Sequence, residues 1–340
     1  MNILITGAAG FIGYHLCARL IQSTQNNVIG LDNLNDYYDV NLKKSRLNEL
    51  DKIFKDKNKF TFIKGDLINK QKILDLFDLH SPEVVINLAA QAGVRYSIEN
   101  PNAYVESNIL GFTNILETAK KFNVKHFIYA SSSSVYGGNT KMPFSENESV
   151  DHPISLYAAT KKSNELIAHT YSHIYGLPTT GLRFFTVYGP WGRPDMALFL
   201  FTKAIIEGRQ IEIFNNGNMI RDFTYIDDVV EAIFYCCFKP VTKEENFNYK
   251  NPDPSKSFAP HKIFNIGNNN PVKLLDFVSL LEDSLGKKAK KNFIEMQKGD
   301  VEVTSSDSSN IRDWINFTPK INIKDGVQKF VNWYVDFYKY

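Results

Sequence analysis

The chain has 340 residues, and its 39 basic and 37 acidic residues give a formal net charge of +2. At roughly 100–200 residues per domain, this length indicates two domains, or one large domain with an appended part. The balanced charge argues against a nucleic-acid or membrane-surface partner, and 43% hydrophobic with 22% charged residues excludes a disordered, collagenous or coiled-coil protein.

Short apolar runs alternate with segments of helical periodicity in the first half of the chain. The runs predict strands at Asn2–Thr6, Asn27–Leu31, Phe60–Lys64, Val84–Leu88, His126–Ala130 and Thr179–Phe185. Apolar residues at three- and four-residue steps predict helices over Phe11–Ile21 and Ala103–Phe122. This alternation favours right-handed βαβ units, so we predict an α/β fold with a doubly wound parallel sheet.

The pattern loosens after Pro190, where Gly and Pro become frequent and the predicted strands shorten. The polar segment Val241–His261 carries three prolines and is predicted to be a surface loop. Helical spacing over Lys324–Tyr338 predicts a last amphipathic helix. We expect this region to form a smaller mixed α/β domain.

Three cysteines at unrelated spacings predict neither a disulfide framework nor a metal site. The first predicted strand begins directly after Met1, and no apolar run is long enough to span a bilayer. We therefore expect a cytoplasmic protein without a signal peptide or a membrane partner.

The loop Gly7-Ala-Ala-Gly10-Phe11-Ile12-Gly13 follows the first strand and opens the first helix. Such glycines let backbone N–H groups approach a pyrophosphate at a helix N-terminus, which indicates a Rossmann dinucleotide site. Asp32 ends the second strand about 20 residues later, where an acid accepts from ribose hydroxyls and repels a 2′-phosphate. NAD is therefore favoured over NADP. Asp66 and the run Leu88-Ala89-Ala90 follow the next strands and are predicted to line the same site.

Tyr157 and Lys161 lie four residues apart on a predicted helix and so share one face. A nearby ammonium and a positive nicotinamide ring lower the pKa of a phenol, which lets it act as a general base. The same Tyr-x-x-x-Lys spacing occurs at Tyr235 and Lys239, but no run of hydroxyl residues accompanies it. We interpret this second pair as core packing. The serine run Ser131–Ser134 follows the fifth strand and is predicted to place hydroxyls beside Tyr157.

The motifs TGAAGFIG, SSSSVYG, YAATK and RFFTVYGP stand in the order seen in extended short-chain dehydrogenase/reductases, the NAD-dependent epimerase/dehydratase family. The resemblance covers nearly the whole chain. It implies tightly bound NAD, resting as NAD⁺, and a nucleotide sugar held by the smaller domain. It also implies a catalytic set of Ser132, Tyr157 and Lys161, and a proton relay completed by Asn108. The residues that would contact NAD are Gly7, Gly10, Phe11, Ile12, Gly13, Asp32, Asn33, Asp66, Leu67, Leu88, Ala89, Ala90, Asn108, Tyr157, Lys161 and Phe184.

Within that family the stretches AGVRYS and GPWGRPDMA most resemble those of UDP-glucuronate 4-epimerases. That resemblance implies inversion at C4 through a transient 4-keto sugar, with hydride returned to the opposite face. It implies that Thr186 and Arg193 hold the sugar carboxylate, helped by Ser133 and Ser134. A guanidinium suits this task because its fork matches a carboxylate. The remaining predicted substrate residues are Arg95, Ala197, Arg221 and Asp300.

Several alternatives remain open at this point. The main one is a UDP-galactose or UDP-N-acetylglucosamine 4-epimerase, followed by a UDP-glucuronate decarboxylase. A 4,6-dehydratase would carry an Asp-Glu pair where this chain has Ser133 and Ser134, and serines lack the pKa for that proton transfer. The intact catalytic set argues against a non-catalytic NAD sensor, and the lack of a basic stripe argues against an RNA-binding relative.

The resemblance also sets the expected organisation of the chain. We predict an NAD-binding domain over residues 1–186, to which 224–239 and 262–270 return, and a sugar-binding domain over 187–223 and 271–340. The family leads us to expect a homodimer joined through the helical segments Ala103–Phe122 and Ser155–Tyr175.

Overall fold

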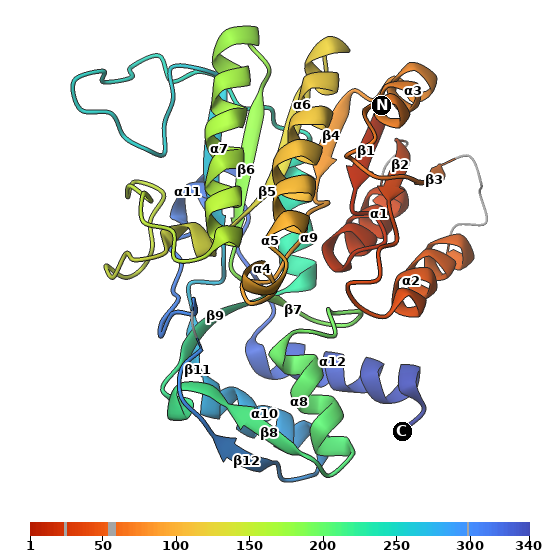
Figure 1. Cartoon of the computed structure of the whole chain (residues 1–340), viewed down its shortest axis with the longest axis vertical. Helices are drawn as coiled ribbons and strands as arrows, with labels where there is room; N and C mark the ends of the chain where they lie inside the picture. Colours follow the sequence, from red (N-terminus) through yellow and green to blue (C-terminus); the bar gives the residue numbers. More distant parts are fainter. Residues whose placement is uncertain (24–25, 54–58, 298) are drawn as a thin grey trace.

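The computed structural model describes residues 1–23, 26–53, 59–297 and 299–340. Its larger part is a seven-stranded parallel sheet in the order β10-β6-β5-β4-β1-β2-β3 (Figure 1). The strands are β1 (Asn2–Thr6), β2 (Asn27–Asp32), β3 (Phe60–Lys64), β4 (Val84–Asn87), β5 (His126–Ser132), β6 (Thr179–Phe184) and β10 (His261–Ile266). All six predicted strands are therefore confirmed to within two residues, and the doubly wound parallel sheet is confirmed as well.

Helices cover both faces of this sheet because its strands are apolar on both sides. Ile3 and Ile5 of β1 face one buried cluster, which contains residues of α1 (Phe11–Ser23), α2 (Val40–Ile53) and α9 (Ile226–Cys237). Leu4 faces the other cluster, with α3 (Lys70–His80), α6 (Phe112–Lys121) and α7 (Leu156–Tyr175). The short helices α4 (Tyr96–Glu99), α5 (Pro101–Tyr104), η2 (Ser133–Tyr136) and α11 (Ser309–Ile315) complete this part.

The helix predicted over Ala103–Phe122 is not one continuous α-helix. The segment η1 (Val105–Gly111) between α5 and α6 is a π-helix, which a three- and four-residue apolar spacing cannot reveal. Asn108 lies inside this wider turn and is buried. Leu110 of η1 and Leu166 of α7 are exposed by 49% and 58%, and the homodimer expected through these helices stays a prediction.

The smaller part lies below the carboxyl ends of the large sheet in Figure 1. It holds a three-stranded sheet of β7 (Thr186–Tyr188), β9 (Ile220–Tyr225) and β11 (Pro271–Lys273), and a two-stranded sheet of β8 (Gln210–Ile213) and β12 (Lys290–Phe293). Its other elements are α8 (Ala197–Ile206), η3 (Phe214–Gly217), α10 (Leu274–Leu285) and α12 (Ile323–Tyr338). The predicted last helix is α12, and its apolar face, including Phe330 and Tyr334, is buried as expected.

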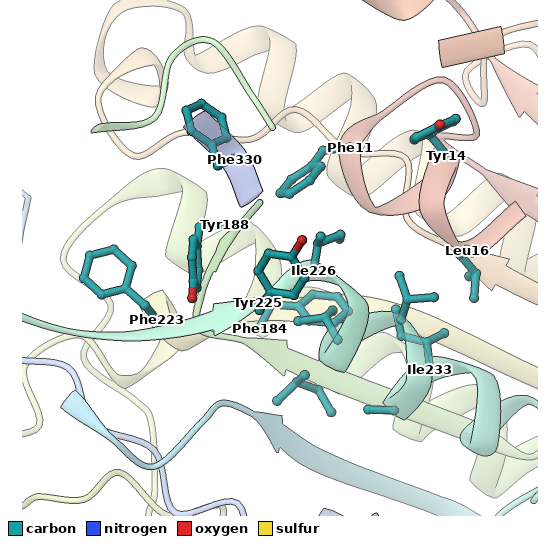
Figure 2. Close-up of a cluster of buried hydrophobic side chains, with 14 of the residues drawn as sticks. Phe11, Tyr14, Leu16, Phe184, Tyr188, Phe223, Tyr225, Ile226, Ile233 and Phe330 are labelled. Atoms are coloured by element: carbon teal, nitrogen blue, oxygen red, sulfur yellow. The ribbon is translucent and has the colours of Figure 1, made fainter. Parts of the chain in front are cut away.

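The two parts share one hydrophobic core. Figure 2 shows Phe11 of α1, Tyr188 of β7, Tyr225 of β9 and Phe330 of α12 gathered in one cluster. In addition, α9 packs against α1, and β10 pairs with β6 in the large sheet. The chain therefore returns twice to the larger part, while the division into two functional domains stays a prediction.

Three further expectations concern the rest of the chain. No helix or strand occurs between α9 and β10, so the predicted surface loop over Val241–His261 is confirmed apart from its last residue. Cys17, Cys236 and Cys237 are buried and free. In the part of the chain that the structure describes, no helix has the length and apolar character needed to cross a membrane.

A buried ion pair joins β6 to α7 beneath the serine run. The Arg183 guanidinium donates from Nε and Nη2 to the Glu165 carboxylate at 2.8 and 2.9 Å, and the two side chains are 2% and 1% exposed. Ser131 at the end of β5 donates to the same carboxylate at 2.7 Å. The pair therefore fixes α7, which carries Tyr157 and Lys161, against the end of β5, which carries Ser132.

Removing one partner of this pair leaves a buried, uncompensated charge. We expect Arg183→Met to lower the free energy of unfolding by about 3–5 kcal/mol, and Arg183→Met combined with Glu165→Met to recover most of that loss. Urea unfolding of the three proteins at one pH measures both values. A single variant within about 1 kcal/mol of the parent would contradict a stabilising role for the pair.

Candidate active site

A cavity of about 750 Å³ lies at the carboxyl ends of the large sheet, between the two parts of the molecule. All the site residues predicted from the sequence line it except Asn108. At one end lie the glycine loop, Asp32, Asn33, Asp66 and Leu67. In the middle lie Leu88, Ala89, Ala90, Ser132, Ser133, Ser134, Tyr157, Lys161 and Phe184. Towards the smaller part lie Arg95, Thr186, Arg193, Ala197, Arg221 and Asp300.

The glycine loop leaves no room for side chains. Gly7 has φ +73°, and a Cβ there would lie 2.9 Å from the backbone nitrogen of Ala89. A Cβ on Gly13 would lie 2.1 Å from the carbonyl oxygen of Gly7. The backbone at the start of α1 therefore forms part of the cavity wall, as a bound pyrophosphate requires. The loop fits the dinucleotide predicted for it.

The acids at the adenosine end are held by backbone amides. The Asp32 carboxylate accepts from the N–H of Ala9 at 3.1 Å and of Leu34 at 2.8 Å. Asn33 donates to Asp66 at 2.8 Å. Burial raises the pKa of Asp32, and the neighbouring Lys43 ammonium opposes that shift. Asp32 thus lies at the end of β2, in the place predicted for a ribose acceptor.

Asn108 lies behind the cavity wall rather than on it. Its side chain accepts from the backbone N–H of Gln91 at 2.8 Å and donates to the Gln91 carbonyl at 3.0 Å. Its own carbonyl accepts from Asn164 at 2.6 Å. The structure does not bring Asn108 to the cofactor side of the cavity, but uses it to fix Gln91, which does line the cavity.

Tyr157, Lys161 and Ser132 converge on one wall of the cavity. Burial raises the pKa of Tyr157, while the Ser132 hydroxyl and the Arg193 cation oppose the rise. Lys161 is 4% exposed and donates to the carbonyl of Ala130 at 2.9 Å. Burial lowers the pKa of Lys161 to about 8. Arg193 is therefore a cation that favours the Tyr157 phenolate, and the effect of Lys161 on Tyr157 stays a prediction.

Arg193 approaches this wall from the turn between β7 and α8. Its Nε donates to Asp195 at 3.0 Å, its Nη2 donates to the other Asp195 oxygen, and the Tyr37 hydroxyl donates to Asp195 at 3.1 Å. The guanidinium holds the pKa of Asp195 below its usual value. Burial, helped by Asp195, raises the pKa of Tyr37 to about 12, so Tyr37 stays a donor at neutral pH.

The turn that carries Arg193 is held by residues of the larger part. Arg46 of α2 is fully buried and donates to the carbonyls of Trp191 at 2.6 Å, Gly192 at 3.2 Å and Ala9 at 2.9 Å. Trp191 has φ +61°, in the left-handed region. Burial lowers the pKa of His15 to about 4, so neutral His15 donates from Nε2 to the Pro190 carbonyl at 2.9 Å.

At the far end of the cavity, Arg221 donates to Asp300 at 2.9 Å, so the structure brings these two predicted residues together. Gln297 lines the same end, and its buried Oε1 has no hydrogen-bond partner among the described residues. Arg95 stacks over the Phe214 ring at 4.9 Å. This end therefore combines two guanidinium groups and an amide with spare bonding capacity.

The comparisons with known proteins agree with this geometry. The model for the NAD dependent epimerase/dehydratase family matches residues 3–266. The chain belongs to this family. It is 57% identical over 339 residues to "Protein CapI" of Staphylococcus aureus, with 100% of both chains covered. It is 46% identical over 340 residues to a "Probable UDP-glucuronate 4-epimerase" of Rhizobium meliloti, covering 100% of this chain and 98% of that protein.

A solved structure resembles the whole chain. The UDP-glucuronic acid 4-epimerase from Bacillus cereus in complex with UDP-glucuronic acid and NAD has a TM-score of 0.87 and 33% identity, over 99% of this chain and 100% of that chain. The predicted family and NAD as its cofactor are confirmed. The roles of individual residues stay predictions.

The residues that hold the site together carry no signal in the sequence motifs. Tyr37, Lys43, Arg46 and Asp195 were not singled out, because no motif links these positions. The sequence GRPD did signal an acid two residues after Arg193. The match at Tyr235 and Lys239 lies outside the cavity, as expected, but Tyr235 is 42% exposed rather than part of the core.

The buried ammonium of Lys161 should cost the cofactor-free protein stability. Its pKa falls from 10.5 to about 8, so the penalty is complete below pH 8 and is lost as the pH rises towards 10.5. We expect Lys161→Met to unfold at higher urea at pH 7, with a gain of about 3 kcal/mol that disappears near pH 10. The adjacent Lys162→Met is the control. An equal gain at pH 7 and pH 10 would contradict the titration argument.

Proposed function

We propose that this NAD-dependent family member interconverts UDP-glucuronate and UDP-galacturonate by inverting C4 of the sugar. The observation that supports the sugar acid is the place of Arg193, a guanidinium in the cavity close enough to Tyr157 to lower the pKa of its phenol. A cation at the reacting end suits a substrate with a carboxylate on C6. The names of the relatives support the same choice.

In this proposal the residues of the chain position the sugar and move one proton. Tyr157 removes the proton of the 4-hydroxyl, and Ser132 donates a hydrogen bond that stabilises the phenolate. Lys161 lines the cavity and is held by the Ala130 carbonyl, from where it would contact the cofactor. When bound, NAD⁺ supplies the hydride acceptor for C4 and a positive charge that lowers the pKa of Tyr157 further. The hydride goes back to the opposite face, so there is no net redox change.

A sugar acid brings a hazard at the 4-keto stage. The 4-keto sugar is a β-keto acid, which loses CO₂ when the bond to the carboxylate aligns with the carbonyl π system. A carboxylate held by Arg193 and Thr186, with hydroxyls from Ser133 and Ser134, can be kept out of that alignment. This assignment gives the four residues one common task.

One observation favours a second candidate, an epimerase of uncharged UDP-hexoses. Asp195 neutralises Arg193, so the Arg193–Asp195 pair carries no net positive charge. An uncharged sugar would be compatible with such a pair. Ser133 and Ser134 stand where a dehydratase needs acid and base groups, so dehydration has no support.

Turnover of UDP-glucuronate without added NAD tests the proposal directly. We expect purified protein to form UDP-galacturonate, because the family retains NAD and the reaction regenerates it. Chromatographic separation of the products measures the conversion, and Tyr157→Phe should lower kcat by a factor of about 10²–10⁴. Formation of a UDP-pentose alone would indicate a decarboxylase, and equally fast turnover of UDP-glucose would contradict the preference for the acid.

The carboxylate clamp makes a separate prediction. We expect Arg193→Ala to release CO₂ and a UDP-pentose from UDP-glucuronate, with at least about a tenfold rise in pentose formed per epimerisation. Mass spectrometry of the nucleotide products measures this ratio. Arg209→Ala, at an exposed arginine paired with Glu207, is the control and should leave the ratio unchanged. If Arg193→Ala binds UDP-glucuronate normally and forms no pentose, the clamp is wrong.

A further inference from the structure

Asp195 is a cavity residue that none of the predicted roles uses. It lies at the start of the segment leading into α8, and its two carboxylate oxygens bind the Nε and Nη2 groups of Arg193. Its side chain is 28% exposed, compared with 24% for Arg193, so the pair faces the cavity without being free in solvent. A carboxylate beside the proposed anion-binding group needs an explanation, because it would repel a substrate carboxylate.

The geometry of the Arg193–Asp195 pair explains why a carboxylate can lie beside the proposed anion-binding group. A guanidinium has five N–H donors, and Asp195 uses one on Nε and one on Nη2. Asp195 takes neither donor of Nη1 and leaves the second donor of Nη2. These groups form the end-on edge of the fork, which can still bind a second carboxylate with two parallel hydrogen bonds. Asp195 therefore occupies the side of Arg193 and leaves its end available.

A third residue fixes the orientation of this pair. Tyr37, from the loop between β2 and α2, donates its hydroxyl to Asp195 at 3.1 Å. Gly93, with φ +102°, lets this hydroxyl approach, because a Cβ there would lie 2.7 Å from it. The Tyr37 ring packs against Tyr96 with centroids 5.0 Å apart. Gly93 and Tyr96 thus fix the position of the Tyr37 side chain, and its hydrogen bond in turn fixes the orientation of Asp195.

We propose that Asp195, oriented by Tyr37, is a positioning residue that sets selectivity for the sugar acid by presenting only the end-on edge of Arg193 to the substrate. This inference rests on the proposed function. Because the Arg193–Asp195 pair is neutral, the site recognises a carboxylate by the geometry of two hydrogen bonds rather than by net charge. Without Asp195 the long Arg193 side chain can adopt other rotamers, and both the clamp and its effect on Tyr157 weaken.

The effect on Tyr157 gives a readout that a purely structural residue would not change. Among the described residues, Ser132, Arg193 and Tyr104 interact with Tyr157, and Lys161 lines the same cavity. Of these, Arg193 is the one bonded to Asp195. Loss of a fixed Arg193 raises the pKa of Tyr157, so the acid limb of the kcat profile should move to higher pH.

The experiment uses the NAD-containing enzyme and compares Asp195→Ala, Asp195→Asn and Tyr37→Phe with the parent. We expect Asp195→Ala to weaken binding of UDP-glucuronate about 10-fold to 100-fold, while binding of UDP-glucose changes less than about threefold. The acid limb of kcat should rise by about one pH unit. Asp195→Asn keeps one acceptor oxygen and should be intermediate, and Tyr37→Phe should show a smaller change in the same direction. Glu99→Gln, which removes a carboxylate from the same cavity wall, is the matched control and should leave the selectivity ratio unchanged.

The outcomes separate the two proposals. If the parent enzyme does not epimerise UDP-glucuronate, the proposed function fails. If it does, and Asp195→Ala weakens both ligands equally with no shift of the acid limb, the inference about Asp195 is overturned. Tighter binding of UDP-glucuronate by Asp195→Ala would also overturn it, because Asp195 would then compete with the substrate. If Asp195→Ala fails to fold, the affinity for UDP-glucuronate relative to UDP-glucose is compared in Asp195→Asn and Tyr37→Phe instead.

Discussion

The buried guanidinium of Arg46 connects the two halves of the active site. Its three nitrogens donate to the Ala9 carbonyl within the glycine loop, to the Trp191 and Gly192 carbonyls before Arg193, and to the Tyr38 hydroxyl. A cation with no exposed surface is costly unless its donors are satisfied, and here each nitrogen has a partner. The left-handed conformation of Trp191 fits this constraint, because Arg46 binds the carbonyl of that residue twice. The position of Arg193 thus depends on the loop that forms the cofactor site.

The contacts of Arg46 explain how one cavity can hold NAD and a UDP-sugar in fixed positions relative to each other. The glycine loop and Asp32 belong to the large sheet, whereas Arg193 and Asp195 belong to the segment entering α8. The link to His15 through Pro190 and the link to Tyr37 through Asp195 repeat the pattern, since both donors come from the larger part. Three separate contacts therefore hold one turn. The Glu165–Arg183 pair has the corresponding effect on the opposite wall, where it joins the strand of Ser132 to the helix of Tyr157.

Much of this arrangement could be predicted from the sequence because it depends on local patterns. Apolar runs and helical spacing located the strands, and the glycine loop, Asp32, the serine run and Tyr157 each follow a strand or share a helix. The residues that were missed act over long sequence distances. Arg46 bonds to Trp191 and Tyr37 to Asp195, 145 and 158 positions away, and no spacing rule connects such pairs. Asn108 was predicted to contact NAD but lies behind the cavity wall, in the π-helix Val105–Gly111, which the apolar spacing of the sequence could not reveal. Its predicted part in a proton relay stays a prediction.

The cavity also suggests how a sugar ring can turn each of its two faces towards the cofactor. Arg221, Gln297 and Asp300 line the cavity towards the smaller part, and Arg193 lines it where it lowers the pKa of Tyr157. A ring that turns between two hydride transfers must keep its pyrophosphate fixed while its C6 group moves. The serines at 133 and 134 and the end-on edge of Arg193 offer hydrogen bonds from different elements, so a carboxylate can keep partners in more than one ring orientation. If the substrate is the proposed sugar acid, selectivity and rotation make opposite demands on the site, which a fixed Arg193 beside the hydroxyls of Ser133 and Ser134 would meet.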